Sequence, residues 1–95
     1  MSWTVKINQK VLKKLKKFQP VITINFAKLI DDLTQEGPLI SHWSHFGKLK
    51  NGSNLYHCHI NGNPLIIALW LVINDEDKMM EVTDVVTHQE FDKKY

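Results

Sequence analysis

The fold of this chain is decided by the stretch LYHCHINGNPLIIALWLVI, residues 55–73. It predicts two neighbouring antiparallel strands, residues 55–60 and 65–73, with a turn at Asn61-Gly62 between them. The second strand is almost wholly apolar, as a central strand covered on both faces would be. The stretch therefore predicts the middle of a β-sheet, and the flanking sequence must cover it.

The first of these strands would carry two histidines on one face. Side-chain alternation places Cys58 and Ile60 together, and His57 and His59 on the opposite face. If the cysteine and isoleucine are buried, two imidazoles lie side by side away from the core. Groups that titrate near neutral pH on a rigid strand suit proton transfer.

In the flanking segments, the spacing of the apolar residues predicts further strands and helices. From the N-terminus we expect a strand at 3–7, a basic amphipathic helix with N-cap Asn8 and apolar residues Val11, Leu12, Leu15 and Phe18, and a second helix from Pro20 to a stop at Gly37-Pro38. A loop at 39–46 then leads to a strand from Gly47 to Lys50, a hairpin turn at Asn51-Gly52 and the two strands described above. After a polar turn at 74–78 we expect a last strand, with Met80, Val82, Asp84 and Val86 on one face, and a polar tail at 88–95.

The order β-α-α-β-β-β, with room for one extra short strand, predicts an α+β fold, in one domain that spans residues 1–95. After an N-terminal strand, an α-helical hairpin would pack on one face of a mainly antiparallel sheet of four or five strands. The other face would stay partly open and would carry His57 and His59.

Composition is that of an ordinary globular chain of 95 residues, 43% hydrophobic and 23% charged. The longest apolar run, residues 65–73, is too short to span a membrane, and the N-terminus lacks a signal peptide. With a single cysteine and no internal disulfide, we expect a cytoplasmic protein.

Charge is distributed unevenly along the chain. Residues 1–50 carry nine lysines and three acids, and residues 51–95 carry three lysines and seven acids. All the basic residues are lysines, which bind phosphate as point charges and lack the bidentate fork of arginine. The lysines of the first helix allow two interpretations: a solvated face around a core stripe, or a surface for RNA or an acidic partner segment.

The histidine pair also leaves several interpretations open. It could be two solvated surface histidines. It could bind a metal with His88, His42 or His45, although no metal-ligand spacing supports this, and we expect no metal and no cofactor. It could also cleave RNA by internal 2′-OH attack, which needs a base, an acid and cations near the phosphate.

At the level of these motifs the sequence resembles the RelE/ParE superfamily of bacterial toxins. It is most similar to RelE-like cytotoxic translational repressors of type II toxin–antitoxin systems, with histidines like those of YafQ-like members. The resemblance covers nearly the whole chain and rests on Trp3-Thr4-Val5-Lys6-Ile7, Gly37-Pro38, Trp43, Lys48-Leu49, Tyr56-His57-Cys58-His59-Ile60, Gly62, Pro64, Ala68, Trp70, Glu81-Val82 and Thr87-His88.

The resemblance implies a RelE-like fold and a ribosome-dependent mRNA endonuclease that inhibits translation without a metal. Its partners would be the ribosome, mRNA and a cognate antitoxin, in a hetero-oligomer that binds operator DNA. Residue by residue, it implies proton transfer by His59 and His88. It adds His57 and Tyr95 to the catalytic group, and it implies RNA binding by Lys48, Lys50 and Phe91.

The sequence departs from this branch at two places. Asn63 stands where the branch usually has an arginine, and Asp84-Val85-Val86 replaces a Tyr-x-x-Gly pattern before Thr87-His88. Lys50 is our candidate for the missing cation. Two alternatives follow: a weakly active or inactive RelE-like module that still binds an antitoxin, and a ParE-like gyrase inhibitor on the same fold.

Overall fold

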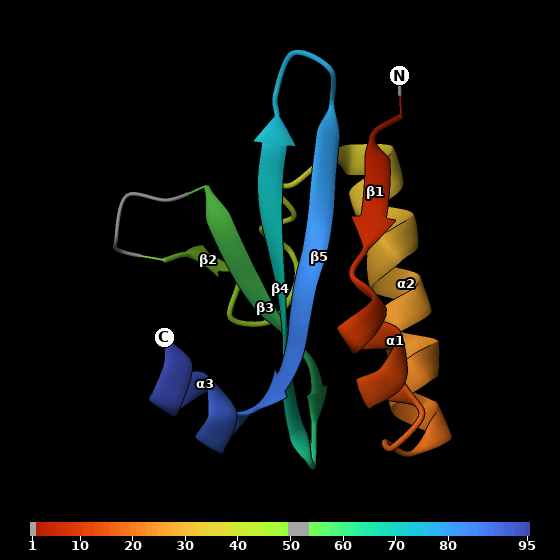
Figure 1. Cartoon of the computed structure of the whole chain (residues 1–95), viewed down its shortest axis with the longest axis vertical. Helices are drawn as coiled ribbons and strands as arrows, with labels where there is room; N and C mark the ends of the chain where they lie inside the picture. Colours follow the sequence, from red (N-terminus) through yellow and green to blue (C-terminus); the bar gives the residue numbers. More distant parts are fainter. Residues whose placement is uncertain (1, 50–53) are drawn as a thin grey trace.

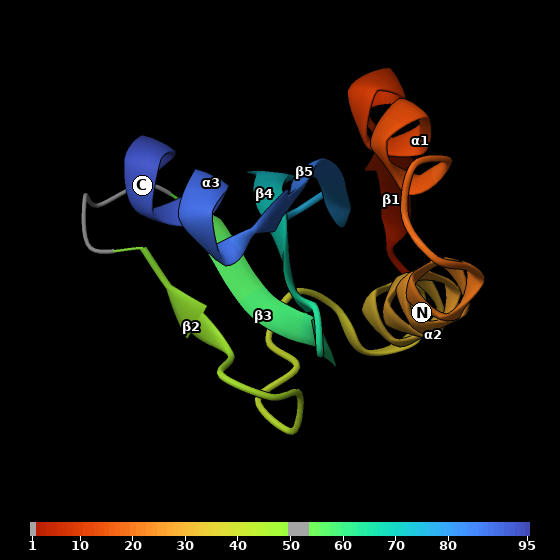
Figure 2. The ribbon, with the colours of Figure 1, turned by 90° about the horizontal axis from the view of Figure 1, so that it is seen from below.

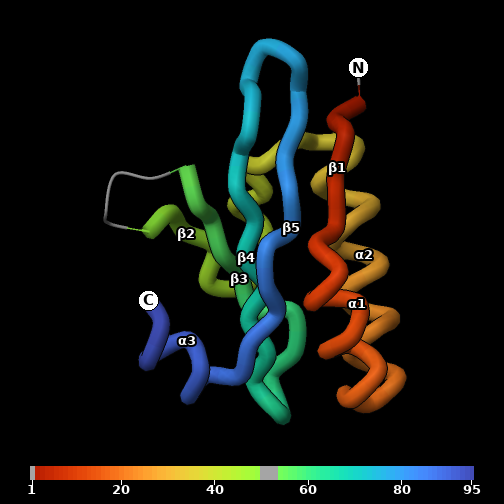
Figure 3. The backbone as a smooth tube through the Cα atoms, in the orientation of Figure 1, coloured from red at the N-terminus to blue at the C-terminus, as the bar shows by residue number. Residues whose placement is uncertain are grey.

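A five-stranded sheet forms the centre of the computed structural model, which describes residues 2–49 and 54–95 (Figures 1 and 3). In chain order the elements are β1 (Thr4–Ile7), α1 (Gln9–Leu15), α2 (Pro20–Glu36), β2 (Gly47–Lys48), β3 (Leu55–Gly62), β4 (Leu65–Asn74), β5 (Met79–Thr87) and α3 (His88–Lys94). The strand order is β1-β5-β4-β3-β2; β1 runs parallel to β5, and the other neighbours are antiparallel. The predicted α+β class is confirmed. None of the described helices is long and apolar enough to cross a membrane.

The main hydrophobic core lies between α2 and one face of the sheet (Figure 2). The apolar stripe of α2 (Ile22, Phe26, Leu29 and Leu33) is buried there, and Cys58 and Ile60 of β3 face it as expected. Trp70 of β4 is fully buried, and its indole Nε1 donates a hydrogen bond to the Pro38 carbonyl at 3.2 Å. This bond satisfies the one polar atom of the ring, so the indole can fill the core without an unpaired donor.

The helix limits follow local signals. The Asn8 side chain accepts a hydrogen bond from the Lys10 backbone N–H and caps α1, and Pro20 opens α2. Gly37 ends α2 with a φ of 92°, a conformation that favours glycine. One expectation was wrong: Leu12 is 46% exposed and lies outside the core, because only Val11 and Leu15 of the short α1 turn inward.

The turn between β3 and β4 lies later than predicted. Pairing continues through Gly62, which is opposite Leu65, so Asn63-Pro64 forms the turn. A bulge between His59 and Asn61 shifts the register and carries the strand past the predicted turn signal. The predicted hairpin turn at Asn51-Gly52 lies outside the described residues.

A second bulge, in β5, overturns the predicted strand face. Leu69 pairs with Asp84 and Trp70 with Val82, so one residue of β5 has no partner of its own. Because side chains alternate with a period of two, this extra residue reverses the phase of the rest of the strand. Val85 therefore joins the core with Met80 and Val82, whereas Asp84 and Val86 point to the opposite face.

The polar tail predicted at 88–95 is instead a helix, α3, on the sheet face opposite to α2 (Figure 2). The Thr87 side chain accepts a hydrogen bond from the Glu90 N–H, and the Glu90 side chain accepts one from the Thr87 N–H. This capping box satisfies donors that would otherwise be left free at the helix start. Phe91 then packs on Ile67, Leu69 and Val86 of the sheet.

Candidate functional site

His57 lies in the middle of β3 and is enclosed on two sides. Its ring is 5.4 Å from the Phe91 ring, centroid to centroid, and it is opposite Gly47 of β2. A Cβ atom on Gly47 would lie only 3.2 Å from His57 Nε2. The Nδ1 atom is buried and finds no hydrogen-bond partner in the described part of the chain. Burial lowers the pKa of His57, because desolvation disfavours the charged ring.

His59 is more open and stacks on His45, a residue of the loop before β2. The two ring centroids are 4.1 Å apart and the rings are inclined by 16°. The His59 N–H donates a hydrogen bond to the Ser44 carbonyl at 2.8 Å, which holds this loop against β3. Both imidazoles line an open hollow of about 550 Å³, together with Asn61 and Leu65.

The surroundings of His59 favour its neutral form. Burial lowers the pKa of His59, and the nearby charges of His45, His57 and His88 lower it further. A neutral imidazole has a free nitrogen lone pair and can accept a proton. His59 therefore has the protonation state and the access that a general base needs.

His88 is the first residue of α3 and is largely exposed. Its Nδ1 lies 3.4 Å from Asp92 Oδ2, one helical turn further on. When the ring is protonated this contact is an ion pair. Val86 pairs with Ile67 and Ile67 with His59, so His88, two residues beyond Val86 at the start of α3, begins on the side of the sheet that carries His59.

The two predicted aromatic residues lie on α3. Phe91 contacts His57, and the Tyr95 ring follows at 5.5 Å from Phe91. The Tyr95 side chain is partly exposed, and burial, followed by the charge of Asp84, raises its pKa. The phenol is thus a neutral hydrogen-bonding group at the end of an aromatic row.

Lys48, one of the two predicted lysines, does not lie with these histidines. Lys48 pairs with Tyr56, and its Nζ lies 5.9 Å from the centroid of that ring. Since Tyr56 packs against the main core, the backbone directs Lys48 away from the histidine face. Lys50 lies outside the described residues.

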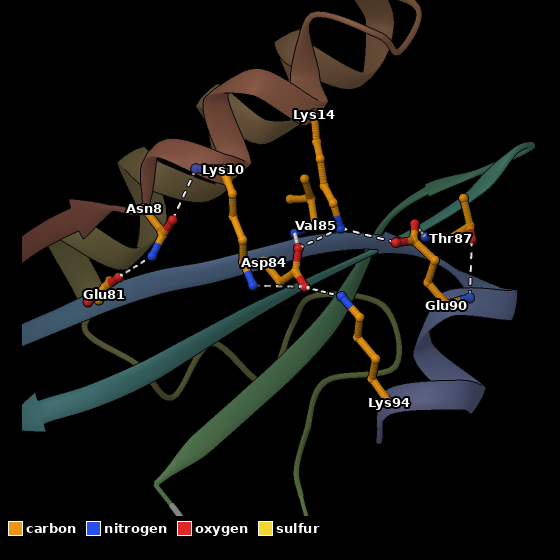
Figure 4. A network of polar contacts seen from close by, with 9 residues as sticks. All are labelled: Asn8, Lys10, Lys14, Glu81, Asp84, Val85, Thr87, Glu90 and Lys94. Atoms are coloured by element: carbon orange, nitrogen blue, oxygen red, sulfur yellow. Dashed lines mark hydrogen bonds and ion pairs between the residues drawn. The ribbon is translucent and has the colours of Figure 1, made fainter.

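A buried carboxylate on this face was missed by the sequence analysis. Asp84 is fully buried and attracts three lysines: Lys14 Nζ at 2.8 Å, and Lys10 Nζ and Lys94 Nζ at 3.5 Å (Figure 4). Lys14 also contacts Glu90 Oε2 at 3.1 Å. We call these five residues the Asp84 clip. The one local signal was an aspartate on the predicted apolar face of the last strand.

The charges within the clip stabilise one another. Burial alone would raise the pKa of Asp84, but the contacts with the lysines outweigh it and lower the pKa. Burial likewise acts to lower the pKa of Lys14, and its hydrogen bonds to Asp84 and Glu90 reverse the effect and raise it. Both groups are therefore charged at neutral pH.

The described residues bring together one group of three possible metal ligands, Asp32, Glu36 and His42, with ligand atoms within 4.8 Å of one another. It lies at the end of α2 and in the loop that follows, and it does not include His57 or His59. Asp32 Oδ2 already accepts a hydrogen bond from Trp43 Nε1 at 2.8 Å. These three side chains form a polar cluster at the surface, beside the Trp43 indole.

Solved structures share this fold. The chain matches a chain of the archaeal RelE–RelB complex from Pyrococcus horikoshii OT3 with a TM-score of 0.76 and 22% sequence identity; the match covers 92% of this chain and 96% of that chain. A mutant of Escherichia coli toxin RelE in the free state matches with a TM-score of 0.73 and 15% identity, over 97% and 90%. A metal-bound toxin from Helicobacter pylori matches with a TM-score of 0.69 and 21% identity, over 95% and 98%. No protein-family model matches the sequence, and no curated protein matches it significantly.

Proposed function

We propose that this chain is a single-domain toxin of a type II toxin–antitoxin system that cleaves mRNA on the ribosome and so inhibits translation. The observation that carries the proposal is the stacked pair His45–His59 in an open hollow, with His88 at the start of α3 on the same side of the sheet. The RelE fold adds to it, because solved structures of that fold include a mutant of Escherichia coli toxin RelE in the free state and the intact Escherichia coli RelBE toxin–antitoxin complex.

In the proposed reaction, neutral His59 takes the proton from a ribose 2′-OH. The 2′ oxygen attacks the adjacent phosphorus, a 2′,3′-cyclic phosphate forms, and the bond from phosphorus to the 5′ oxygen breaks. Protonated His88 gives its proton to the leaving 5′ oxygen. The base and the acid are thus supplied by two imidazoles in opposite protonation states, as general acid–base catalysis requires.

The other residues have supporting roles in this proposal. His45 stacks on His59 and adds to the effect of burial in lowering the pKa of His59, because two adjacent imidazoles resist double protonation. Phe91 and Tyr95 offer a surface on which a base could stack, and His57 supports Phe91 from below. Lys48 and Lys50 remain proposed RNA contacts.

The proposed protein partner is an antitoxin, present with the chain in the cytoplasm. An acidic or amphipathic antitoxin segment would dock on the lysines of α1 or on the open sheet face. Lys13, Lys16 and Lys17 remain exposed for such contacts, whereas Lys14 is drawn into the Asp84 clip. A complex with the antitoxin would then bind operator DNA.

A second candidate is a non-catalytic relative that still binds an antitoxin. The position of Lys48 on the other face favours it, because no lysine lines the hollow at His59 among the residues described. A phosphate in that hollow would have to be neutralised from elsewhere, and removing one oxyanion donor costs roughly 3–4 kcal/mol in other enzymes.

The test is induction of the chain in a bacterial host, with His59→Ala, His88→Ala and, as a control, His42→Ala. His42 is an exposed histidine in the Asp32 cluster, so its loss changes the same residue type away from the hollow. We expect growth arrest with new mRNA 5′ ends in the wild type and His42→Ala, and loss of both effects in the other variants. Absence of arrest by folded wild-type protein would favour the non-catalytic candidate. DNA damage without mRNA cleavage would favour gyrase inhibition.

A further inference from the structure

The Asp84 clip joins three elements that are far apart in the sequence. Lys10 and Lys14 come from α1, Asp84 from β5, and Glu90 and Lys94 from α3 (Figure 4). The bulge in β5 turns Asp84 toward α3, and the carboxylate also accepts a hydrogen bond from the Val85 N–H at 3.0 Å. Asp84 is therefore fixed to the sheet, and the lysines reach it from both helices.

The clip lies at one end of a row of side chains that runs across the sheet. Asp84 pairs with Leu69, and Leu69 pairs with His57, so these residues share one face in adjacent strands. Phe91 of α3 packs on Leu69 and on His57. Thus α3 is held at both ends of the row, by ionic contacts at Asp84 and by ring contacts at His57.

We infer that Asp84 is a positioning residue that seats α3 across the sheet and thereby sets the position of Phe91 and Tyr95 beside His57. The carboxylate acts directly through Lys94, and indirectly through Lys14, which also contacts Glu90. One part of the inference rests on the proposed function: a seated α3 would also fix the distance between His88 and His59.

The Asp84 clip suits this role because the buried Asp84 carboxylate needs the lysines to offset the cost of its burial. A fully buried carboxylate is costly unless cations and donors surround it, whereas Lys10 and Lys94 are half exposed and would be solvated without the contact. When α3 leaves the sheet, Lys94 loses its contact with Asp84 and Phe91 becomes exposed at the same time. The polar and the apolar contacts of α3 should therefore open as one unit.

The experiment compares Lys94→Met with Lys93→Met in the full chain. Both changes remove one charge and keep an apolar stem on α3, but no contact of Lys93 with Asp84 occurs among the described ion pairs. Amide hydrogen exchange in α3 reports its opening, and NMR titration of the His57 ring reports its burial. Asp84→Asn is the stronger variant, and Lys94→Met gives the answer if Asp84→Asn fails to fold.

For Lys94→Met we expect α3 exchange to rise roughly two- to five-fold, the range for loss of one partly exposed ion pair. For Asp84→Asn we expect a rise of about tenfold or more. In both, the pKa of His57 should move up toward 6.5, its ordinary value, because a ring that Phe91 covers less often is better solvated. Lys93→Met should change neither.

The inference would be overturned if Lys94→Met left both the amide exchange of α3 and the titration of His57 unchanged, and Asp84→Asn either left them unchanged too or failed to fold. Neither readout requires RNA cleavage, so a failure of the proposed function leaves this test intact. If cleavage is established, loss of activity in Asp84→Asn without an effect on α3 would likewise contradict a positioning role.

Discussion

Replacement of His57 by phenylalanine should stabilise the protein. In the wild type the buried Nδ1 has no partner among the described residues, and an unsatisfied buried polar atom costs about 1–3 kcal/mol. Phenylalanine removes that atom and keeps the ring contact with Phe91. Its larger ring approaches Gly47, and modest overpacking costs about 1 kcal/mol. The expected net gain is about 1 kcal/mol, or an increase in Tm of roughly 4–8 °C.

The gain should depend on pH in a defined direction. Because burial lowers the pKa of His57 below its ordinary 6.5, the unfolded chain binds a proton there more readily than the folded chain. Wild-type stability therefore falls as pH decreases through 6.5 and levels off below the lower folded pKa. Phenylalanine does not titrate, so the gain should be larger at pH 5.5 than at pH 8.

The assay is thermal unfolding followed by circular dichroism at both pH values, with His59→Phe as the control. His59 lines the open hollow, so the same change there should bring no comparable gain. If the proposed function holds, His57→Phe should also retain mRNA cleavage and His59→Phe should lose it. A His57→Phe protein that is less stable than the wild type by 1 kcal/mol or more at pH 8 would refute the reasoning, because Nδ1 would then have to be satisfied.

Three further predictions concern other contacts. Asp84→Asn should lower the free energy of unfolding by about 1–3 kcal/mol at pH 7. Because the folded pKa of Asp84 lies below its ordinary 3.8, the difference between variant and wild type should shrink as the pH falls through that lower folded pKa, which urea unfolding can measure. Gly37→Ala should lower stability by about 1–3 kcal/mol, since φ is positive and the new Cβ would lie 2.8 Å from Trp3 Nε1; an unchanged urea midpoint would contradict this. Thr87→Ala should cost about 1 kcal/mol by removing the cap of α3, and amide exchange should increase there first and not in α2.

Features with a local cause were predictable from the sequence. The period-two pattern of β3 correctly placed Cys58 and Ile60 in the core, and Pro20 and Gly37 correctly marked the limits of α2. Each of these signals acts within a few residues of the structure that it determines. The start of α3 also had such a signal, the Thr87-x-x-Glu90 capping box, and it was overlooked.

Features that depend on distant residues were not predictable in this way. Lys14 and Asp84 are separated by 70 positions, and their contact depends on where β1 ends beside β5. The stacking of His45 on His59 needs the loop that the Ser44 carbonyl holds against β3. A single sequence contains these residues but gives no measure of which loop reaches which strand.

The bulge in β5, the buried carboxylate and α3 depend on one another. Without the extra residue, regular alternation would direct Asp84 into the main apolar core, where a charge without partners is prohibitive, and would expel Val85. With it, Asp84 faces α3 and meets the lysines. An aspartate in this strand is compatible with the fold only because of the bulge, and the lysines of α1 and α3 make the same aspartate a point of attachment for α3.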